Sequence, residues 1–199
     1  GGSAIADAEY EYGATVVAPA APTKTGYTFA GWSPALPTTM PANNVTVVAQ
    51  WTAVASGVTF MDGDKVVAEI SGAYGDVITT AMVPSMSKDG FNFTGWVDAN
   101  GASVTFPQTL GTEALVVYAT WTAKSYYIEF YNGDEWLDGF NQLCGSAIIT
   151  PEAPSITGKV FVGWFDADGN AMPETVPAKE NQVYYAQYEA ELFTATFMN

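Results

Sequence analysis

The heptapeptide GYTFAGW, residues 26–32, recurs in two altered copies in this chain of 199 residues, and its repetition decides the fold. It returns as GFNFTGW at residues 90–96 and as GKVFVGW at residues 158–164, so successive copies begin 64 and 68 residues apart. A pattern that recurs at such an interval is typical of duplicated structural units. The chain is therefore predicted to be a tandem array of small domains and not one domain of ordinary size.

Two further anchors keep their order in every copy. A short apolar run ends in an aromatic residue, as in VVAQW, VYATW and YYAQY. An aromatic residue or a cysteine is followed by glycine, and a proline stands nine residues after that glycine in all three copies. Chance similarity would not preserve this interval. These anchors are Tyr12-Gly13 with Pro22, Tyr74-Gly75 with Pro84, and Cys144-Gly145 with Pro154.

A first-strand motif sets the boundaries of the repeats. VTFMDGD at residues 58–64 matches IEFYNGD at 128–134, and its phenylalanine lies 15 residues before the anchor glycine. The first copy would need this phenylalanine before residue 1, whereas TATFMN at 194–199 carries the motif once more. We therefore predict residues 1–53 as a repeat that lacks its first strand, 54–123 and 124–190 as complete repeats, and 191–199 as the orphan first strand of a fourth repeat.

Each complete repeat is predicted to contain about five short strands, because no segment shows a sustained helical period. Gly63-Asp64 and Asn100-Gly101 are hairpin signals between β-rich runs. The polar turn at residues 85–90 has room for at most one helical turn. Only a few residues separate the last strand of one repeat from the first strand of the next. We predict a mainly β fold of tandem small domains in an elongated array.

The aromatic anchors are expected to form the small cores, since domains of this size need large apolar side chains. The glycine that precedes each tryptophan is expected to open a bulge or to permit close approach of another group. A bulge would bring the tryptophan to the face of the phenylalanine, whereas an unbroken pleat would leave it on the opposite face. The predicted structural anchors are Phe29, Gly31, Trp32 and Trp51; Phe93, Gly95, Trp96 and Trp121; and Phe161, Gly163, Trp164 and Tyr188.

The composition argues against several classes of function. The formal charge is -15, with 21 acidic residues and six lysines, so nucleic acid and anionic membrane surfaces are poor partners. The apolar runs are too short to insert into a bilayer. Histidine is absent and Cys144 is the single cysteine, which removes the commonest general base and any intrachain disulfide. We predict no catalytic residues, no cofactor and no metal, and we interpret Cys144 as a small apolar residue.

The ordered anchors closely resemble the Listeria–Bacteroides repeat, also called the internalin B-repeat. The Tyr-Gly pair, the prolines, GYTFAGW and MPANNVTVVAQWT at residues 40–52 carry the resemblance, which extends over essentially the whole chain. The third copy departs most, with Cys144, Lys159 and Tyr188 at positions that hold other residues elsewhere. The resemblance implies a β-grasp-like fold in large bacterial surface or secreted proteins, often between a ligand-binding region and a cell-wall anchor. It implies no catalytic residues.

Three local patterns have competing interpretations. Asp166, Asp168 and Asn170 have the alternate spacing of a calcium loop, but the glycine and glutamate of that loop are missing, so a hairpin turn is favoured. Lys65 and Lys124 lie close to strands, where an isopeptide crosslink would need them, but no lysine position is common to the three repeats. Exposed aromatic residues would suit glycan stacking, although core packing explains the anchored set better. Trp136 and Lys159 lie outside that pattern and are the candidate ligand contacts.

The ends of the chain suggest self-association. An unpaired strand edge invites a strand from another chain. Residues 192–199 are expected to pair with an edge of the first repeat, either head to tail in a neighbouring molecule or by folding back on their own chain. The alternative is that residues 1–9 fray and the first repeat is merely weak. The candidate intermolecular strand is Phe193, Thr194, Ala195, Thr196 and Phe197.

The leading functional prediction is a non-catalytic stalk of a bacterial cell-surface, adhesin-like protein. It would be extracellular, with the signal and the anchor outside this segment, and its partners would be other domains of the same protein. The alternative is a module that binds a host protein or a glycan directly.

Overall fold

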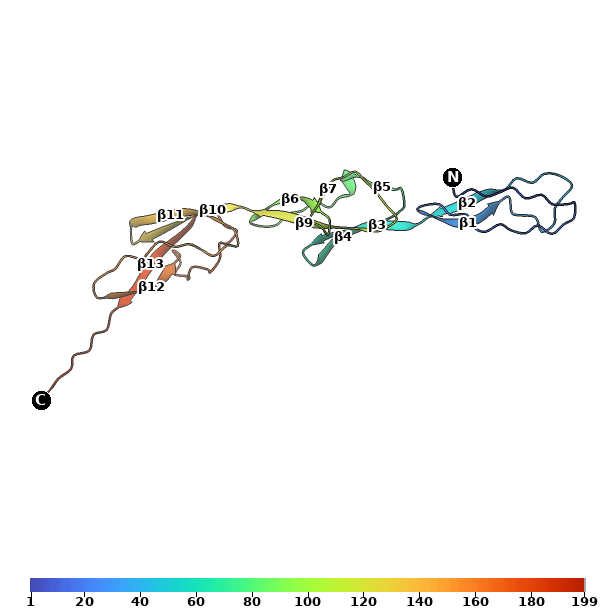
Figure 1. The fold of residues 1–199 in the computed structure, drawn as a ribbon. Helices are drawn as coiled ribbons and strands as arrows, with labels where there is room; N and C mark the ends of the chain where they lie inside the picture. The colour runs from blue at the N-terminus through green and yellow to red at the C-terminus, as the bar shows by residue number, and fades with distance from the viewer. Residues whose placement is uncertain (199) are drawn as a thin grey trace. The chain divides into compact units, whose positions relative to one another are not determined.

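The computed structural model describes residues 1–198. Contacts divide the described chain into two compact units. Gly1–Ser85 and Gly95–Thr120 form the first, which holds the first repeat and most of the second. Met86–Thr94 and the chain from Trp121 onward form the second, which holds the third repeat and the tip of the second. Strands are nearly the only regular secondary structure in both units, which confirms the predicted mainly β fold of small sheets (Figure 1).

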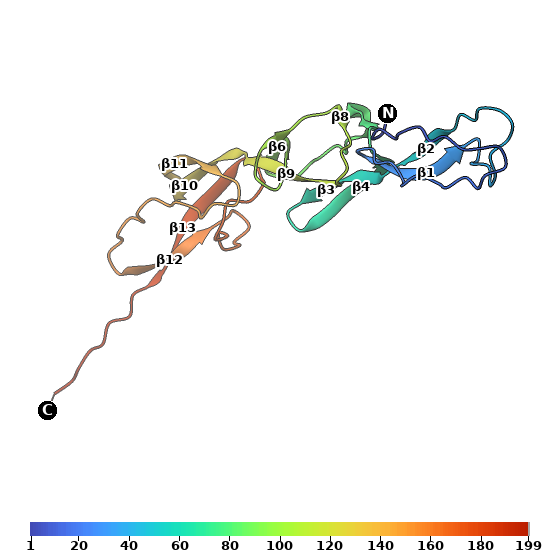
Figure 2. The same cartoon turned by 45° about the vertical axis from the view of Figure 1, so that its right-hand side comes forward.

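The second repeat contains a five-stranded sheet in the order β4-β3-β9-β6-β7 (Figure 2). The predicted hairpin is confirmed, because β3 and β4 pair antiparallel around Gly63-Asp64. β3 also pairs parallel with β9, so the first and last strands of the repeat lie side by side at the centre of the sheet. The strands are β3 (Ala55–Asp62), β4 (Lys65–Ala73), β6 (Phe91–Val97), β7 (Ser103–Val104) and β9 (Leu115–Ala123).

The crossover between the two central strands carries the remaining small elements of this repeat. Parallel neighbours need such a long connection. It includes a two-stranded sheet of β5 (Val77–Ile78) and β8 (Gln108–Thr109). Its single 3₁₀ turn, η1, lies at Thr80–Met82 and therefore before Pro84. The polar stretch at 85–90, for which the sequence allowed at most one helical turn, forms an isolated bridge and a turn.

The third repeat repeats this central arrangement with four strands, in the order β11-β10-β13-β12. β10 pairs antiparallel with β11 and parallel with β13, as β3 does with β4 and β9. The first and last strands of both complete repeats are therefore central, which is the β-grasp-like arrangement. The strands are β10 (Ser125–Asn132), β11 (Glu135–Leu143), β12 (Lys159–Phe165) and β13 (Gln182–Ala190).

The first repeat contains a two-stranded sheet of β1 (Tyr27–Ser33) and β2 (Val48–Ala53). The turn at Tyr12-Gly13 nevertheless makes the same backbone hydrogen bond as the turns at Tyr74-Gly75 and Cys144-Gly145. The Gly13 amide donates to the Met40 carbonyl at 2.9 Å, as Gly75 does to Leu110 and Gly145 does to Val176. This shared bond holds the anchor turn in place in all three copies.

The glycine opens a bulge in the Gly-Trp pairs of the first and third repeats. The pairing register shifts between Phe29 and Gly31 and again between Phe161 and Gly163. The bulge brings the tryptophan to the face of the phenylalanine, and the Phe29 and Trp32 rings meet edge to face at 5.2 Å. The structure therefore decides between the two alternatives left open by the sequence. The glycines have φ of 116° (Gly31), 140° (Gly95) and 152° (Gly163), which favours a residue without a side chain.

The core of each complete repeat forms where the first strand meets the Gly-Trp pair. Phe60 and Phe130 are fully buried, and each meets its repeat's tryptophan, Trp96 or Trp164, edge to face at 4.9 Å. Trp32 of the first repeat is only half-buried, since its sheet has no such first strand in the described residues. The other anchors Phe29, Trp51, Phe93, Trp121 and Tyr188 are half-buried, and Phe161 is 38% exposed.

Candidate functional surfaces

The first glycine of the heptapeptide forms the junction with the next repeat. Gly26 is buried, and a Cβ added to it would overlap the ring of Tyr74, the anchor residue of the second repeat. A Cβ on Gly90 would overlap the Cys144 sulfur and would come within 2.9 Å of the Ala178 Cβ. The side chains of Tyr74 and Cys144 therefore each pack against the glycine of the preceding repeat. We call this contact the glycine junction.

Two backbone hydrogen bonds complete each glycine junction. The amide of the linker residue Val54 donates to the Gly26 carbonyl at 2.9 Å, and the Tyr74 amide donates to the Val54 carbonyl at 2.8 Å. Lys124 has the same role at the second junction, between Gly90 at 2.8 Å and Cys144 at 2.9 Å. The linker residue is thus bonded on both sides, to the repeat before it and to the repeat after it.

A lysine lies over the aromatic residue that follows each of these glycines. The Lys24 Nζ lies 3.8 Å from the Tyr27 ring centroid, and the Lys88 Nζ lies 4.9 Å from that of Phe91. Each also approaches the tryptophan that ends the last strand, Trp51 or Trp121. Such cation–π contacts contribute about 0.5–1 kcal/mol at exposed sites. The sequence contains a signal for this contact, because both lysines stand two residues before the first glycine of the heptapeptide. The sequence interpretation missed it.

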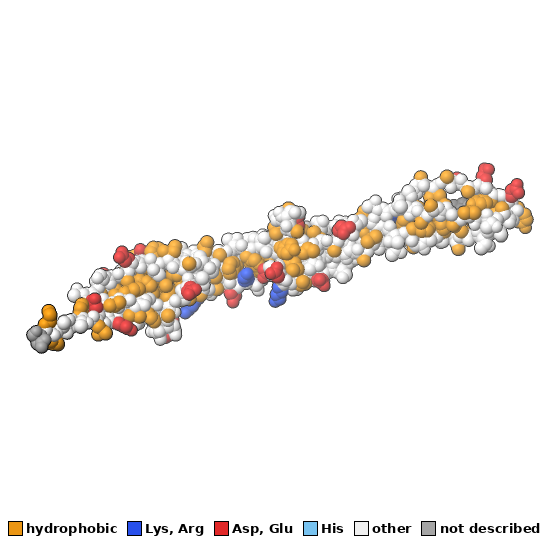
Figure 3. All heavy atoms as spheres, turned by 60° about the horizontal axis from the view of Figure 1, so that its bottom comes forward, with side chains coloured by type: hydrophobic (Ala, Val, Ile, Leu, Met, Phe, Trp, Pro, Cys, Tyr) orange, Lys and Arg blue, Asp and Glu red, His pale blue; other side chains and the backbone are white. Residues whose placement is uncertain are grey.

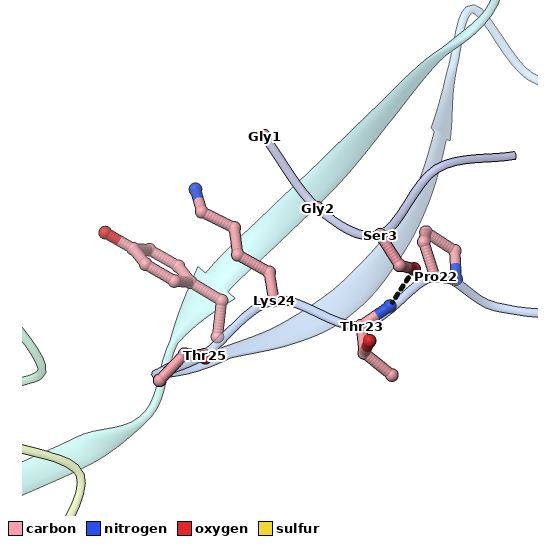
Figure 4. Close-up of a pocket in the computed structure, with 8 residues that line it drawn as sticks. Gly1, Gly2, Ser3, Pro22, Thr23, Lys24 and Thr25 are labelled. Atoms are coloured by element: carbon pink, nitrogen blue, oxygen red, sulfur yellow. Dashed lines mark hydrogen bonds between the residues drawn. The ribbon is translucent and has the colours of Figure 1, made fainter.

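A shallow hollow adjoins each lysine. In the first repeat Gly1, Gly2, Ser3, Pro22, Thr23, Lys24, Thr25 and Tyr27 line it, and the Ser3 hydroxyl accepts a hydrogen bond from the Thr23 amide (Figure 4). In the second repeat the hollow includes Lys88 and Phe91 at the equivalent positions. Both hollows are open to solvent, and both lie beside a lysine that covers an aromatic ring. We therefore interpret them as shallow surface depressions and not as binding pockets.

The outer face of the third repeat carries a row of four aromatic residues, one on each strand. Tyr131 on β10 lies opposite Trp136 on β11 and opposite Tyr185 on β13. Tyr185 in turn lies opposite Phe165 on β12. The Tyr131 and Tyr185 rings are 5.7 Å apart, and Trp136 is 51% exposed. We call these residues the aromatic row. In the second repeat, the positions of Trp136, Tyr131 and Tyr185 hold Val66, Met61 and Tyr118.

Tyr131 of the aromatic row keeps its proton near neutral pH. Partial burial raises the pKa of Tyr131 above its ordinary value, and the charge of Glu129 raises it further. A neutral phenol donates and accepts hydrogen bonds while its ring offers an apolar face. Figure 3 shows apolar side chains gathered in patches on the face drawn, among scattered acidic groups. Such a surface suits an uncharged partner better than an anionic one.

The structure separates the two candidate ligand contacts. Trp136 lies on β11 and Lys159 begins β12, and these strands are the opposite edges of the third sheet. Lys159 occupies the place of Tyr27 and Phe91, so the third repeat has no ring at that position. Trp136 instead belongs with the aromatic row, which sequence reasoning missed because the row depends on register across four strands.

Asp166 organises the turn that follows β12. Its carboxylate accepts hydrogen bonds from the Asp168 and Asn170 amides at 3.0 and 2.8 Å and from the Asn170 side chain. Asp98 does the same in the second repeat, where it accepts from Asn100 and Ala102. The shared geometry favours the turn interpretation over a calcium loop, since the oxygens are engaged by local donors.

Asp166→Ala is expected to lower the melting temperature of the third repeat modestly. The hydrogen bonds from Asn170 lower the pKa of Asp166, so its contribution is complete above the unfolded-state value, about 3.9 for aspartate. It is lost as the pH falls through the lower pKa of the folded protein. Thermal unfolding followed from neutral pH to about pH 2 checks this, with Asp168→Ala as the control. Equal melting temperatures for both variants at neutral pH would contradict it.

The candidate intermolecular strand leaves β13 as an extended segment in both ribbon views (Figures 1 and 2). Residues 191–198 lie outside the strands of the described chain, and residue 199 lies outside the described residues. Phe193 and Phe197 are 77% and 93% exposed, and Thr194, Ala195 and Thr196 between them are exposed as well. The pairing of this segment with another chain stays a prediction.

Comparison with known proteins identifies the repeats. The Listeria-Bacteroides repeat domain matches residues 1–50, 57–120 and 131–187. The chain belongs to this family. Each matched segment contains one Gly-Trp pair and one anchor turn. The match also confirms the resemblance seen in the sequence.

The chain is also similar to parts of longer proteins. The chain is 28% identical over 94% of its length to a "Putative membrane protein" of Evansella cellulosilytica, and 29% identical over 87% to a "Putative Gly-rich membrane protein" of the same bacterium. It is 37% identical over 41% of its length to Internalin H of Listeria monocytogenes. The matched regions span 30%, 23% and 16% of those proteins. Within residues 1–198, no helix has the length and apolarity needed to cross a membrane.

Proposed function

We propose that this repeat region is a non-catalytic stalk of a bacterial surface protein, which carries other modules of the same protein away from the cell wall. Family membership and the similarity to Internalin H indicate a surface repeat protein at the coarser level. The single observation that supports the stalk is the glycine junction, which occurs at both contacts between consecutive repeats. A junction with two hydrogen bonds and a packed side chain restricts bending of the linker.

The composition also suits an extracellular spacer. The formal charge of -15 keeps such an array soluble and discourages collapse onto anionic surfaces. A single cysteine and compact aromatic cores make its stability independent of disulfides. The array would act mechanically, so its partners would be the adjoining domains of the same chain.

Surface display tests the stalk directly. The repeats are inserted between a cell-wall anchor and a peptide tag, and capture of the tag by a large antibody is measured. A flexible Gly/Ser linker of equal residue number is the control, because its mean reach grows only as about 5–6 Å times the square root of its length. The repeats are expected to give the higher capture. Equal or lower capture than the flexible linker would contradict the stalk.

The aromatic row favours a second candidate function, direct contact with a glycan or a host protein. Exposed aromatic faces stack on sugar rings, and neutral phenols hydrogen-bond to hydroxyls. Trp136, at one end of the row, is the most accessible of the four. This role would add weak contacts to the stalk and would not replace it.

Trp136→Ala is expected to reduce retention on a glycan array or on a host-protein surface without changing the fold. The side chain is half-exposed, so its removal leaves the core of the third repeat intact. Val66→Ala changes the equivalent position in the second repeat and is the matched control. Circular dichroism verifies folding of both variants. Unchanged retention of Trp136→Ala, or equal loss in both variants, would count against ligand binding by the aromatic row.

A further inference from the structure

The aromatic row extends into a wider aromatic surface on the third repeat. Tyr127 and Tyr131 both stand on β10, and Ile128 and Phe130 between them are buried in the core. Because side chains alternate along a strand, the two tyrosines share the outer face of the sheet. Tyr127 is 44% exposed. We call Tyr127 together with the aromatic row the aromatic face.

A glycine on the neighbouring strand makes room for Tyr127. Gly139 on β11 lies opposite Glu129, and a Cβ built on Gly139 would overlap the hydroxyl of Tyr127. The Tyr127 ring therefore leans across to β11 and toward the aromatic row. The second repeat has the reverse arrangement, because Gly57 and Glu69 occupy the positions of Tyr127 and Gly139. The loss of one side chain and the gain of the other are thus complementary.

The aromatic face differs from the second repeat in its rings and not in the charge at its centre. At the pair that separates Tyr127 from the aromatic row, the acidic residue only changes strand. Glu69 faces Thr59 in the second repeat, and Glu129 faces Gly139 in the third. The five positions of the aromatic face hold a single ring in the second repeat. They are Gly57, Met61, Val66, Tyr118 and Val97.

We propose that the aromatic face binds a neutral oligosaccharide, with its sugar rings stacked on Trp136, Tyr131 and Tyr185. The proposal rests on the second candidate function and is independent of the stalk. The aromatic row crosses four strands, which makes it roughly 14 Å long at a strand spacing of about 4.8 Å. That length exceeds one sugar ring, so the ligand is a chain of several sugars. Their apolar faces pack on the rings, and their hydroxyls bond to the phenols.

The charge of this surface selects a neutral ligand. Strands β10, β11 and β13 contain no lysine or arginine, and the formal charge of -15 opposes the approach of an anionic polysaccharide. A cationic ligand would gain from added carboxylates, but the exchanges that create the aromatic face add rings instead. Asn141 and Gln187 are exposed beside Tyr127 and Tyr185, where their amides can bond to further hydroxyls.

Isothermal titration calorimetry of the whole chain tests the proposal. The ligands are cellohexaose and chitohexaose, which are neutral, hexagalacturonate, which is anionic, and a lysine hexapeptide. At least one neutral hexasaccharide is expected to bind, with one site per chain because the second repeat lacks the rings. Its affinity should change less than about twofold between about 0.05 and 0.5 M salt, since a neutral ligand has no charge to screen.

Two variants test the contribution of Tyr127. Tyr127→Ala removes the ring, and Gly139→Ala displaces it while every ring stays in the chain. Gly139 lies within β11, so alanine fits the backbone there. Each variant is expected to weaken binding at least about fivefold. Ile149→Ala shortens an exposed apolar residue of the same repeat outside the aromatic face and should change the affinity less than about twofold. Circular dichroism verifies that all three variants fold.

Several outcomes would overturn the proposal. They are no binding of either neutral hexasaccharide, binding of the lysine peptide alone, two sites per chain, or equal weakening by Ile149→Ala. If no sugar binds but Trp136→Ala still loses retention on a host-protein surface, the aromatic row is a contact site for another class of partner. The stalk is unaffected by either result, because surface display measures it separately.

Discussion

Replacing Phe130 with alanine is expected to unfold the third repeat at a temperature at which the rest of the chain is still folded. Phe130 is 0% exposed, and its ring centroid lies 4.9 Å from that of Trp164 and 6.1 Å from that of Tyr184. Removing a fully buried phenylalanine costs about 3–5 kcal/mol. A domain of this size has little stability to lose, since small cores are marginal.

Urea unfolding followed by tryptophan fluorescence and near-ultraviolet circular dichroism measures the loss. Phe161→Ala is the control, because Phe161 contacts the same Trp164 ring at 5.5 Å but is 38% exposed. Its free energy of unfolding should fall by clearly less than that of Phe130→Ala. Equal losses would show that the first-strand phenylalanine is not the centre of the core.

Gly26→Ala is expected to be more destructive than its one added methyl suggests. Gly26 has φ of 77°, a conformation that disfavours alanine by about 1–2 kcal/mol. The methyl would also overlap the Tyr74 ring. Overpacking of this kind costs about 1–3 kcal/mol more. The variant should therefore loosen the contact between the first and second repeats as well as lower the melting temperature.

Gly101→Ala separates these two effects. Gly101 has φ of 81°, but nothing lies within 4 Å of a Cβ built on it in the described chain. It therefore carries the backbone cost without the clash. Differential scanning calorimetry of both variants should show the larger loss for Gly26→Ala. A loss for Gly101→Ala that equals or exceeds it would mean that the Tyr74 contact contributes nothing.

Local sequence signals predicted much of the fold. The Gly63-Asp64 hairpin follows from residues adjacent in the chain, and such a feature depends little on the rest of the molecule. The bulge at the Gly-Trp pair was one of the alternatives that the sequence left open. The parallel pairing of first and last strands, as in β3 with β9, was implied only by the family resemblance. Neither periodicity nor turn chemistry specifies a contact across such a separation.

The candidate surfaces were harder to predict because they depend on register and on neighbouring repeats. The aromatic row exists only because Trp136, Tyr131, Tyr185 and Phe165 align across four strands. The role of Gly26 in the glycine junction could not be predicted from its own repeat, because the Tyr74 ring that packs on it belongs to the next repeat. By contrast, the Lys24 and Lys88 contacts follow a spacing that the sequence shows plainly.

The central claim is that the glycine junction couples consecutive repeats. Residual dipolar couplings, measured for the first and second repeats at a concentration where the chain is monomeric, test it most directly. The account predicts that one alignment tensor fits both repeats in the wild-type chain and in Gly101→Ala, and that Gly26→Ala needs two tensors of different magnitude. Two different tensors in the wild-type chain, or a single tensor retained in Gly26→Ala, would contradict it.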